Sequence, residues 1–131
     1  MISGKVDSEL EPHVPLALMG ADGLAVSLPF VLDTGYNREL SLPRKLIERL
    51  GLEWVQVREA ELADGSHIEH RVFRGKVLWD GEWREVEIDE ADSVPLLGTL
   101  LLRGYELKAE MRPRGDVSLK KLPPRKRKTR T

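Results

Sequence analysis

The sequence offers one clear candidate for acid–base chemistry, the triplet Asp33-Thr34-Gly35. The triplet follows the apolar run LPFVL, so the Asp33 carboxylate stands where a buried strand is expected to leave the core. These three residue types also make a good turn, because aspartate and threonine side chains bind backbone N–H groups and glycine tolerates positive φ. A carboxylate here either forms a turn or serves as a general acid or base, and the surrounding sequence must decide between the two.

Two histidines with nearby acids form a second group of candidate residues. His67 and His70 lie close in the sequence to Asp64 and Glu69, and these are residue types that bind metals. Positions three apart in a strand point to opposite faces, so the two imidazoles would not converge. We therefore expect surface or hairpin-flanking roles for them, and no metal site.

The elements that would position these residues are mainly β-hairpins. Asp-Gly pairs occur at Asp22-Gly23, Asp64-Gly65 and Asp80-Gly81, each between apolar segments of strand length. Asp-Gly is a strong hairpin signal, because both residues accept the positive φ of a type I′ turn. The segments YELKAEM and VSLKKL around RPRGD predict a fourth hairpin. The chain is therefore predicted to be all-β apart from short helices.

One segment, SLPRKLIERLGL, has helical spacing. Leu46, Ile47 and Leu50 recur on one helical face, Pro43 suits the first turn, and Gly51 can end the helix in a left-handed conformation. This pattern predicts a helix from about Pro43 to Leu50. The later run LLGTLLLRG fits either a second short helix or a buried strand.

Two signatures in this arrangement resemble the retropepsin-like aspartic proteases. Val31-Leu32-Asp33-Thr34-Gly35 is similar to that family's catalytic loop, a hydrophobic pair followed by Asp-Thr-Gly. Leu96-Leu97-Gly98 resembles the family's second signature, which opens a short helix behind the catalytic loop. Asp64-Gly65 lies where the family has the tip of a hairpin flap over the active site. The resemblance covers roughly residues 14–110 and is nearest to the small free-standing prokaryotic members.

The resemblance implies a closed β-barrel of the acid protease fold that supplies half of a two-fold active site. In that mechanism one carboxylate activates a water while a protonated partner polarises the peptide carbonyl. This chain has one Asp-Thr-Gly, so the second Asp33 must come from another copy of the chain in a homodimer. By the same resemblance, Thr34 would hydrogen-bond across the dimer axis and the Gly35 N–H would support the carboxylate.

The resemblance also assigns the residues around the catalytic loop. Ala63, Asp64, Gly65 and Ser66 would form the flap and bind substrate, and Leu96, Leu97 and Gly98 would support the loop. The chain departs from the retroviral pattern at three places. Tyr36 stands where retroviral members have a small residue, Thr99 replaces a basic one, and the flap tip LADGSH lacks their multiple glycines.

These signatures predict a homodimeric aspartic endopeptidase that needs no cofactor. Its substrate would be an extended peptide or unfolded protein, bound between flap and floor by strand pairing. The first alternative is a catalytically silent module that keeps the fold and binds peptides or dimerises. The second is a small β-barrel that binds nucleic acid through Trp79, Trp83 and the basic C-terminal segment. Tryptophans flanking a hairpin are more often cross-strand packing, and Trp54 is expected in the core.

Composition sets the outer limits of these predictions. A length of 131 residues predicts one domain, residues 1–122, followed by a disordered basic tail, residues 123–131. The tail holds five basic residues and no acid, whereas residues 1–122 hold 16 basic and 22 acidic residues, a net charge of -6. An acidic body disfavours nucleic acid as a partner, the tail being the one exception.

Cysteine and hydropathy patterns bear on the compartment. The chain has no cysteine, so it has no disulfide framework and no thiolate chemistry, which suits a reducing compartment. It shows no stretch of membrane-spanning length and no apolar leader at its N-terminus. We therefore expect a cytoplasmic protein with no membrane association.

Overall fold

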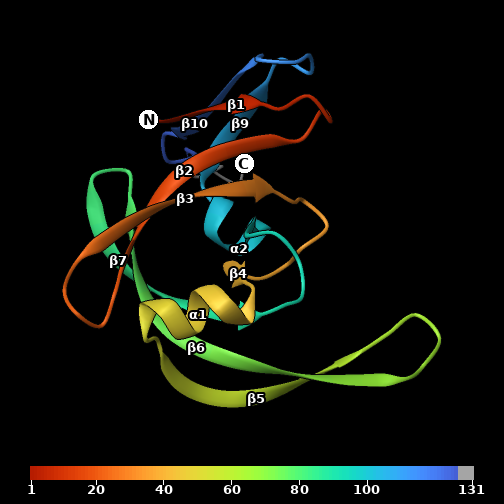
Figure 1. Cartoon of the computed structure of the whole chain (residues 1–131). Coiled ribbons are helices and arrows are strands. Elements are labelled where there is room, and N and C mark those ends of the chain that lie inside the picture. The colour runs from red at the N-terminus through yellow and green to blue at the C-terminus, as the bar shows by residue number, and fades with distance from the viewer. Residues whose placement is uncertain (127–131) are drawn as a thin grey trace.

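A computed structural model describes residues 1–126 as a mainly β fold with two short helices, the fold class that the sequence predicts (Figure 1). The elements, in chain order, are β1 (Ile2–Val6), β2 (Pro12–Met19), β3 (Ala25–Leu32), β4 (Leu40–Leu42), α1 (Arg44–Leu50), β5 (Glu53–Glu61), β6 (His67–Trp79), β7 (Glu82–Glu90), β8 (Leu96–Leu97), α2 (Thr99–Leu102), β9 (Tyr105–Ala109) and β10 (Asp116–Lys121).

The strands form one 10-stranded sheet in the order β5-β6-β7-β4-β8-β3-β2-β1-β10-β9. A further pairing joins β6 to β2 at Val77 and Leu18, so the strands from β6 to β2 close into a barrel. Most neighbours are antiparallel, but β3 pairs with β8 and β4 pairs with β7 in parallel. These parallel pairs bring the end of β3, where Asp33 follows, against the short β8.

The predicted hairpins at the three Asp-Gly pairs and at RPRGD are confirmed, since β2–β3, β5–β6, β6–β7 and β9–β10 are antiparallel pairs joined by those turns. Asp80 and Gly81 both have positive φ, 50° and 89°, as a type I′ turn requires. At the other two pairs only the glycine does, with φ of 82° at Gly23 and 84° at Gly65. The expectation of positive φ at both residues is therefore wrong for these two turns.

Side-chain hydrogen bonds explain the difference between the turns. Asp22 Oδ1 accepts the backbone N–H of Leu24 at 3.0 Å, and Asp64 Oδ1 accepts that of Ser66 at 2.9 Å. In each turn the aspartate side chain accepts the N–H of the residue two positions later, which is an Asx turn. The aspartate keeps negative φ, and the following glycine takes the left-handed conformation.

The predicted main helix is confirmed as α1. Pro43 is its N-cap, and Gly51 ends it in the left-handed conformation with φ 65°. Ile47 and Leu50 are its buried residues. For the run LLGTLLLRG the sequence left a short helix and a buried strand as alternatives. The structure has both, since the strand β8 is followed after Gly98 by the helix α2.

The core is one cluster of aliphatic side chains with Phe30, Phe73 and Trp79, and it includes residues of β1 and β10 as well as those of the barrel strands. Trp54, expected in the core, is 55% exposed. It lies on β5, the edge strand of the sheet, just before a register shift between Trp54 and Gln56. His13 Nε2 lies 2.9 Å from Asp7 Oδ2.

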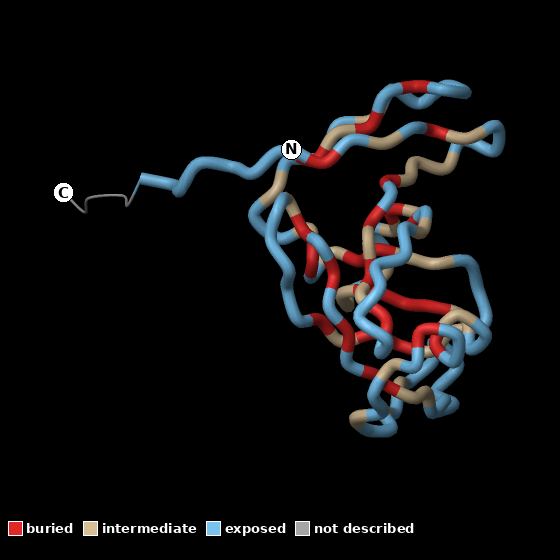
Figure 2. Tube along the Cα trace, turned by 60° about the vertical axis from the view of Figure 1, so that its left-hand side comes forward, coloured by how far each residue is buried: buried red, intermediate tan, exposed pale blue. Residues whose placement is uncertain are grey.

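The barrel and its hairpins use residues up to Leu122, whose N–H donates to the Gly104 carbonyl at 2.9 Å. Residues 123–126 then leave the body as exposed chain (Figure 2). The rest of the tail predicted for residues 123–131 lies outside the described residues. Neither α1 nor α2, nor any other helix in residues 1–126, is long and apolar enough to cross a membrane.

Candidate active site

Asp33 follows β3 directly, at the point where the strand leaves the core. Val31 and Leu32 pair in parallel with Leu96 and Leu97 of β8. The Asp33 N–H donates to the Leu97 carbonyl at 3.0 Å. The loop of Asp33, Thr34 and Gly35, called the Asp33 loop below, is thus fixed to the Leu-Leu-Gly segment that the sequence analysis paired with it.

The Asp33 carboxylate is half-buried and held from within the loop. Its Oδ1 accepts the Gly35 N–H at 2.9 Å, the contact expected from the family resemblance. Gly35 does not have positive φ, so its glycine character is not needed for a left-handed turn. A Cβ at Gly35 would instead lie 3.2 Å from Asp33 Oδ1, close enough to disturb the carboxylate.

Thr34 is exposed at the surface of the single chain. Within residues 1–126 its hydroxyl takes part in no hydrogen bond of this chain. An exposed Thr34 beside a half-buried Asp33 is compatible with a bond to a second chain, which remains a prediction.

Gly98 explains why the second signature ends in glycine. A Cβ at this position would lie 2.1 Å from the Arg38 carbonyl oxygen and 2.6 Å from the Tyr36 carbonyl oxygen, both backbone atoms. The close approach lets the Gly98 N–H donate to the Glu39 carbonyl at 2.9 Å and the Thr99 N–H to the Tyr36 carbonyl at 2.8 Å. The start of α2 therefore packs directly behind the Asp33 loop.

The predicted flap residues Ala63, Asp64, Gly65 and Ser66 form the tip of the β5–β6 hairpin. This hairpin reaches out on the same side of the molecule as the loop between β3 and β4 (Figure 1). The Ser66 hydroxyl and N–H lower the pKa of Asp64, so its carboxylate stays ionised and keeps the turn closed. Within residues 1–126, no hydrogen bond or ion pair joins the tip to the Asp33 loop.

The face of the hairpin can be read from its register. Arg58 pairs with His70, and Ala60 with Ile68 nearer the tip, so these four side chains share one face. Val72 continues this face and pairs with Asp89 of β7. The apolar Ala60 and Ile68 therefore lie nearer the tip than Arg58 and His70, which belong to a polar group around Asp89 at the base of the hairpin.

That polar group is a part of the site that the sequence analysis missed. Asp89 is 5% exposed, and its Oδ2 accepts a hydrogen bond of 2.6 Å from the hydroxyl of Tyr36, the residue after the Asp33 loop. Burial, and then the hydrogen bond to Asp89, raise the pKa of Tyr36 far above its usual range, so the hydroxyl stays a donor. In EVEIDE the alternation assigns Asp89 to the outward face, and nothing local shows that Tyr36 covers it.

Arginines complete the polar group. Glu87 accepts from Arg58 Nη2 at 2.8 Å and from Arg38 Nη2 at 3.1 Å. The hydrogen bond from Arg58 is the main cause that lowers the pKa of Glu87, against a smaller opposing effect of burial. The stem of the β5–β6 hairpin is thus held to β7 and to the segment after the Asp33 loop by paired charges.

The two histidines of β6 have different partners. His67 Nδ1 lies 3.0 Å from Glu59 Oε1, and His70 Nε2 lies 3.5 Å from Asp89 Oδ1. These partners lie on different strands, Glu59 on β5 and Asp89 on β7. The described residues contain no cluster of three or more metal-ligating side chains.

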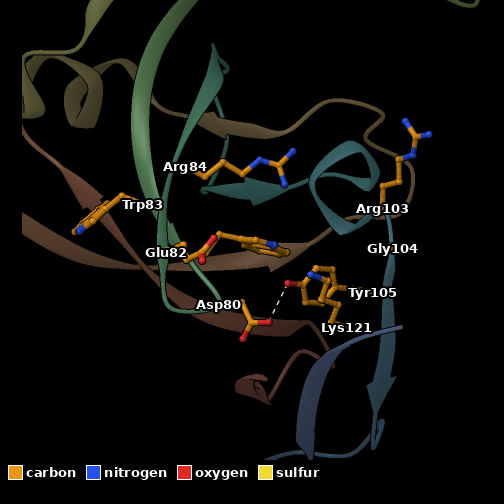
Figure 3. Close-up of a pocket in the computed structure, with 9 residues that line it drawn as sticks. Asp80, Glu82, Trp83, Arg84, Arg103, Gly104, Tyr105 and Lys121 are labelled. Carbon is orange, nitrogen blue, oxygen red and sulfur yellow. Dashed lines mark hydrogen bonds between the residues drawn. The ribbon is translucent and has the colours of Figure 1, made fainter. Parts of the chain in front are cut away.

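A separate pocket of about 520 Å³ lies around the β6–β7 turn and the start of β9 (Figure 3). None of the residues predicted for the peptidase site lines it, whereas Trp79 and Trp83, predicted for the nucleic-acid alternative, both do. Trp79 is 5% exposed there and packs edge-on against Tyr105, with ring centroids 5.3 Å apart. Trp83 also lines the pocket and is 44% exposed (Figure 3). A buried Trp79 cannot stack on a base, which weakens the nucleic-acid alternative.

The comparisons with known proteins agree with this architecture. No protein-family model matches the chain, and no curated protein matches its sequence. Among solved structures, it is similar to the crystal structure of a retropepsin-like aspartic protease from Rickettsia conorii, with a TM-score of 0.55 and 14% sequence identity. The match covers 88% of this chain and 87% of that chain. At this identity the likeness establishes the fold, and the chain therefore has the fold of a retropepsin-like aspartic protease.

Proposed function

We propose that the protein is a homodimeric aspartic endopeptidase in which two copies of Asp33 activate a water molecule. The observation that carries the proposal is the half-buried Asp33 carboxylate, held by Gly35 directly after the buried end of β3 in a retropepsin-like fold. A carboxylate placed in this way is oriented by the backbone through Oδ1, and within residues 1–126 its other oxygen accepts no hydrogen bond.

The reaction requires two carboxylates of this kind. One chain supplies only one, so the second must come from another copy of the chain. Two carboxylates about 3 Å apart share one proton, since both cannot ionise easily. The ionised member takes a proton from water, and the protonated member polarises the peptide carbonyl. A two-fold axis beside the exposed Thr34 would bring the two Asp33 loops together.

Substrate would lie along the face of the β5–β6 hairpin that carries Ala60 and Ile68. Ile68 is 50% exposed, and an extended peptide could pair with the edge strand β5 or with the hairpin tip. Closing the tip over the paired Asp33 loops would exclude water from the reaction. The substrate class is therefore an extended peptide or an unfolded protein segment.

The test is peptide cleavage by the unchanged protein, by Asp33→Asn and by Asp22→Asn. A peptide library is incubated with each protein at pH values from about 3 to 8, a range that spans the titration of shared carboxylates. Asp22 is a matched control, because its Oδ1 accepts the N–H two residues on at 3.0 Å, as Asp33 Oδ1 does at 2.9 Å. Asparagine keeps that acceptor in both variants but cannot do the acid–base step.

We expect Asp33→Asn to lose cleavage by a factor of at least about 10³ while Asp22→Asn keeps it, in line with the weight of a general acid–base group. Cleavage by Asp33→Asn at the rate of the unchanged protein would refute the proposal. Binding of peptides without cleavage by the unchanged protein would instead support the silent peptide-binding alternative.

A further inference from the structure

Tyr36 connects two parts of the molecule that the sequence places far apart. Its main-chain N–H donates to the Asp33 carbonyl at 3.1 Å, and its carbonyl accepts the Thr99 N–H at 2.8 Å. These bonds fix Tyr36 to the Asp33 loop on one side and to the start of α2 on the other. Its side chain then extends to Asp89 on β7.

The Tyr36 hydroxyl has a single proton and two acceptors. Its oxygen lies 2.6 Å from Asp89 Oδ2 and 2.9 Å from the Leu40 carbonyl oxygen. The carboxylate is the stronger acceptor and the shorter contact, so it takes the proton in the conformation described. Removing the hydroxyl would leave a buried carboxylate oxygen without its donor, which is costly.

The second oxygen of Asp89 faces the stem of the β5–β6 hairpin. Asp89 Oδ1 lies 3.6 Å from Arg58 Nη1 and 3.5 Å from His70 Nε2. Arg38 Nε approaches the other oxygen, Oδ2, at 3.7 Å. Good hydrogen bonds to oxygen are about 2.7–3.2 Å long, so none of these three contacts has hydrogen-bond geometry.

These four atoms are buried without a hydrogen-bond partner among the described residues: Asp89 Oδ1, Arg58 Nη1, His70 Nε2 and Arg38 Nε. Arg58 and His70 are cross-strand partners on the same face of the hairpin. A displacement of less than 1 Å of the hairpin stem toward β7 would bring both within hydrogen-bond range of Asp89. The position of the hairpin and the orientation of the Asp89 carboxylate are therefore coupled.

We propose that Tyr36 is a positioning residue that links the Asp33 loop to the stem of the β5–β6 hairpin through Asp89. The hydrogen bond from the Tyr36 hydroxyl fixes the rotation of the Asp89 carboxylate. The carboxylate in turn determines the positions of the Arg58 and His70 side chains. The same residue restrains the Asp33 loop through its backbone. A movement of the hairpin is thereby transmitted to the loop, and its effect on turnover rests on the proposed peptidase function.

The test compares two tyrosine variants that lose the same kind of bond. Tyr36→Phe removes the hydroxyl from Asp89, and Tyr105→Phe removes a hydroxyl that donates to Asp80 Oδ2 at 2.9 Å. Tyr105 lines the separate pocket, which contains none of the residues predicted for the peptidase site. A third variant, Arg58→Gln, weakens the link from the hairpin side at a residue that is only partly buried.

Hydrogen–deuterium exchange of the backbone amides is the first readout, because it needs no enzymatic activity. We expect Tyr36→Phe and Arg58→Gln to speed exchange at least about tenfold in the stem, residues 56–58 and 70–72, with other β-barrel amides unchanged. Tyr105→Phe should leave the exchange of the stem amides unchanged.

Peptide turnover is the second readout. Tyr36→Phe should lower kcat about tenfold and leave KM nearly unchanged, since Tyr36 orients the loop without touching substrate.

Each outcome decides the link. Unchanged stem exchange in Tyr36→Phe would overturn it whatever Arg58→Gln does, because Arg58 also hydrogen-bonds Glu87. A rise spread evenly over the whole barrel would overturn it too. If Tyr36→Phe fails to fold, Arg58→Gln is compared with Glu87→Gln, which loses the Arg58–Glu87 bond but keeps the Arg58 guanidinium beside Asp89. Stem exchange no faster in Arg58→Gln than in Glu87→Gln would then overturn the link. If the unchanged protein cleaves no peptide, the proposed function fails, while faster stem exchange still supports the link and unchanged exchange still overturns it.

Discussion

At the scale of single residues, the site depends on backbone atoms that approach very closely. Gly98 has no room for a side chain, because two carbonyl oxygens occupy the place of its Cβ. The hydrogen bond from Gly35 and the turn at Gly65 likewise rest on backbone groups. Charged side chains have a different task at this scale, since Arg58 and Arg38 hold Glu87 and Asp89 together at the base of the hairpin.

The Glu87 ion pairs predict how acid affects stability. The pKa of Glu87 is lowered below the ordinary value of 4.5, chiefly by the hydrogen bond from Arg58. A lowered pKa in the folded state stabilises the protein above pH 4.5, and this contribution is lost as the pH falls through the folded pKa. In Glu87→Gln that contribution is missing. The urea midpoint of this variant should therefore lie below that of the unchanged protein at pH 7 and approach it at about pH 3.

Glu82→Gln is the matched control for this measurement. Glu82 lies on the same strand, is exposed, and has no ion pair among the described residues. Its substitution should shift the urea midpoint equally little at both pH values. A gap between the unchanged protein and Glu87→Gln that is the same at pH 7 and in acid would contradict the prediction.

At the scale of elements, the molecule is a set of hairpins arranged around two short parallel pairings. Each hairpin is specified by its own turn residues, while β4 and β8 have three and two residues and take their place from their neighbours. The β5–β6 hairpin extends furthest, and β6 continues from it into the barrel as a 13-residue strand. The role of its tip as a flap over the Asp33 loop remains a prediction.

The tip turn predicts a loss of turnover when it is strained. Gly65 has φ 84° and no atom within 4 Å of a Cβ position, so Gly65→Val strains the backbone without a clash. The strain is on the order of 1–3 kcal/mol. We expect a folded protein whose peptide cleavage falls by tenfold or more, since about 1.4 kcal/mol on the barrier gives that factor.

Gly81→Val is the control, because Gly81 also has positive φ, 89°, and open space around it. It lies in the β6–β7 turn, which lines the separate pocket. Equal losses of cleavage in the two folded variants, or no loss in Gly65→Val, would show that the Asp64-Gly65 turn is an ordinary turn. Circular dichroism and sedimentation of both variants establish that each remains folded.

Local chemistry made most of this arrangement predictable. Asp-Gly pairs specified three hairpins, Pro43 and Gly51 marked the ends of α1, and the run before Asp33 marked the end of β3. Features that depend on distant segments were not predictable. Trp54 is exposed because β5 is an edge strand, and Asp89 is buried because Tyr36 and the hairpin stem cover its face. Neither the exposure of Trp54 nor the burial of Asp89 can be recognised from the residues next to them in the sequence.

At the scale of the whole molecule, the proposed active site is complete only in a dimer. The exposed Thr34 and the half-buried Asp33 would meet their counterparts at a two-fold axis, and the rest of the chain forms a closed barrel with its own core. The assembly and a cytoplasmic location both remain predictions.

Removing residues 123–131 should leave the fold and the dimer intact. In the described part of the chain, residues 123–126 are exposed, and the last main-chain hydrogen bond is made by Leu122. The thermal midpoint of a chain ending at Leu122 should match that of the full chain, and sedimentation should show dimers of both. A lowered thermal midpoint, or a monomer where the full chain is a dimer, would assign the tail a structural role.

The dimer itself is tested by sedimentation of the full chain. A full chain that sediments only as a monomer yet cleaves peptides would refute the dimer.

The single bridge between Leu18 and Val77 that closes the barrel also bears on the order in which the chain folds. The hairpins join residues near one another in sequence, and hairpins of this kind form within about 1–10 μs. The bridge joins β2 to β6, which are separated in the sequence by β3, β4, α1 and β5. Long-range pairings of this kind slow folding, because the entropy of loop closure is lost before the contact is gained. We therefore expect the refolding rate to be set by closure of this seam, after the separate hairpins have formed.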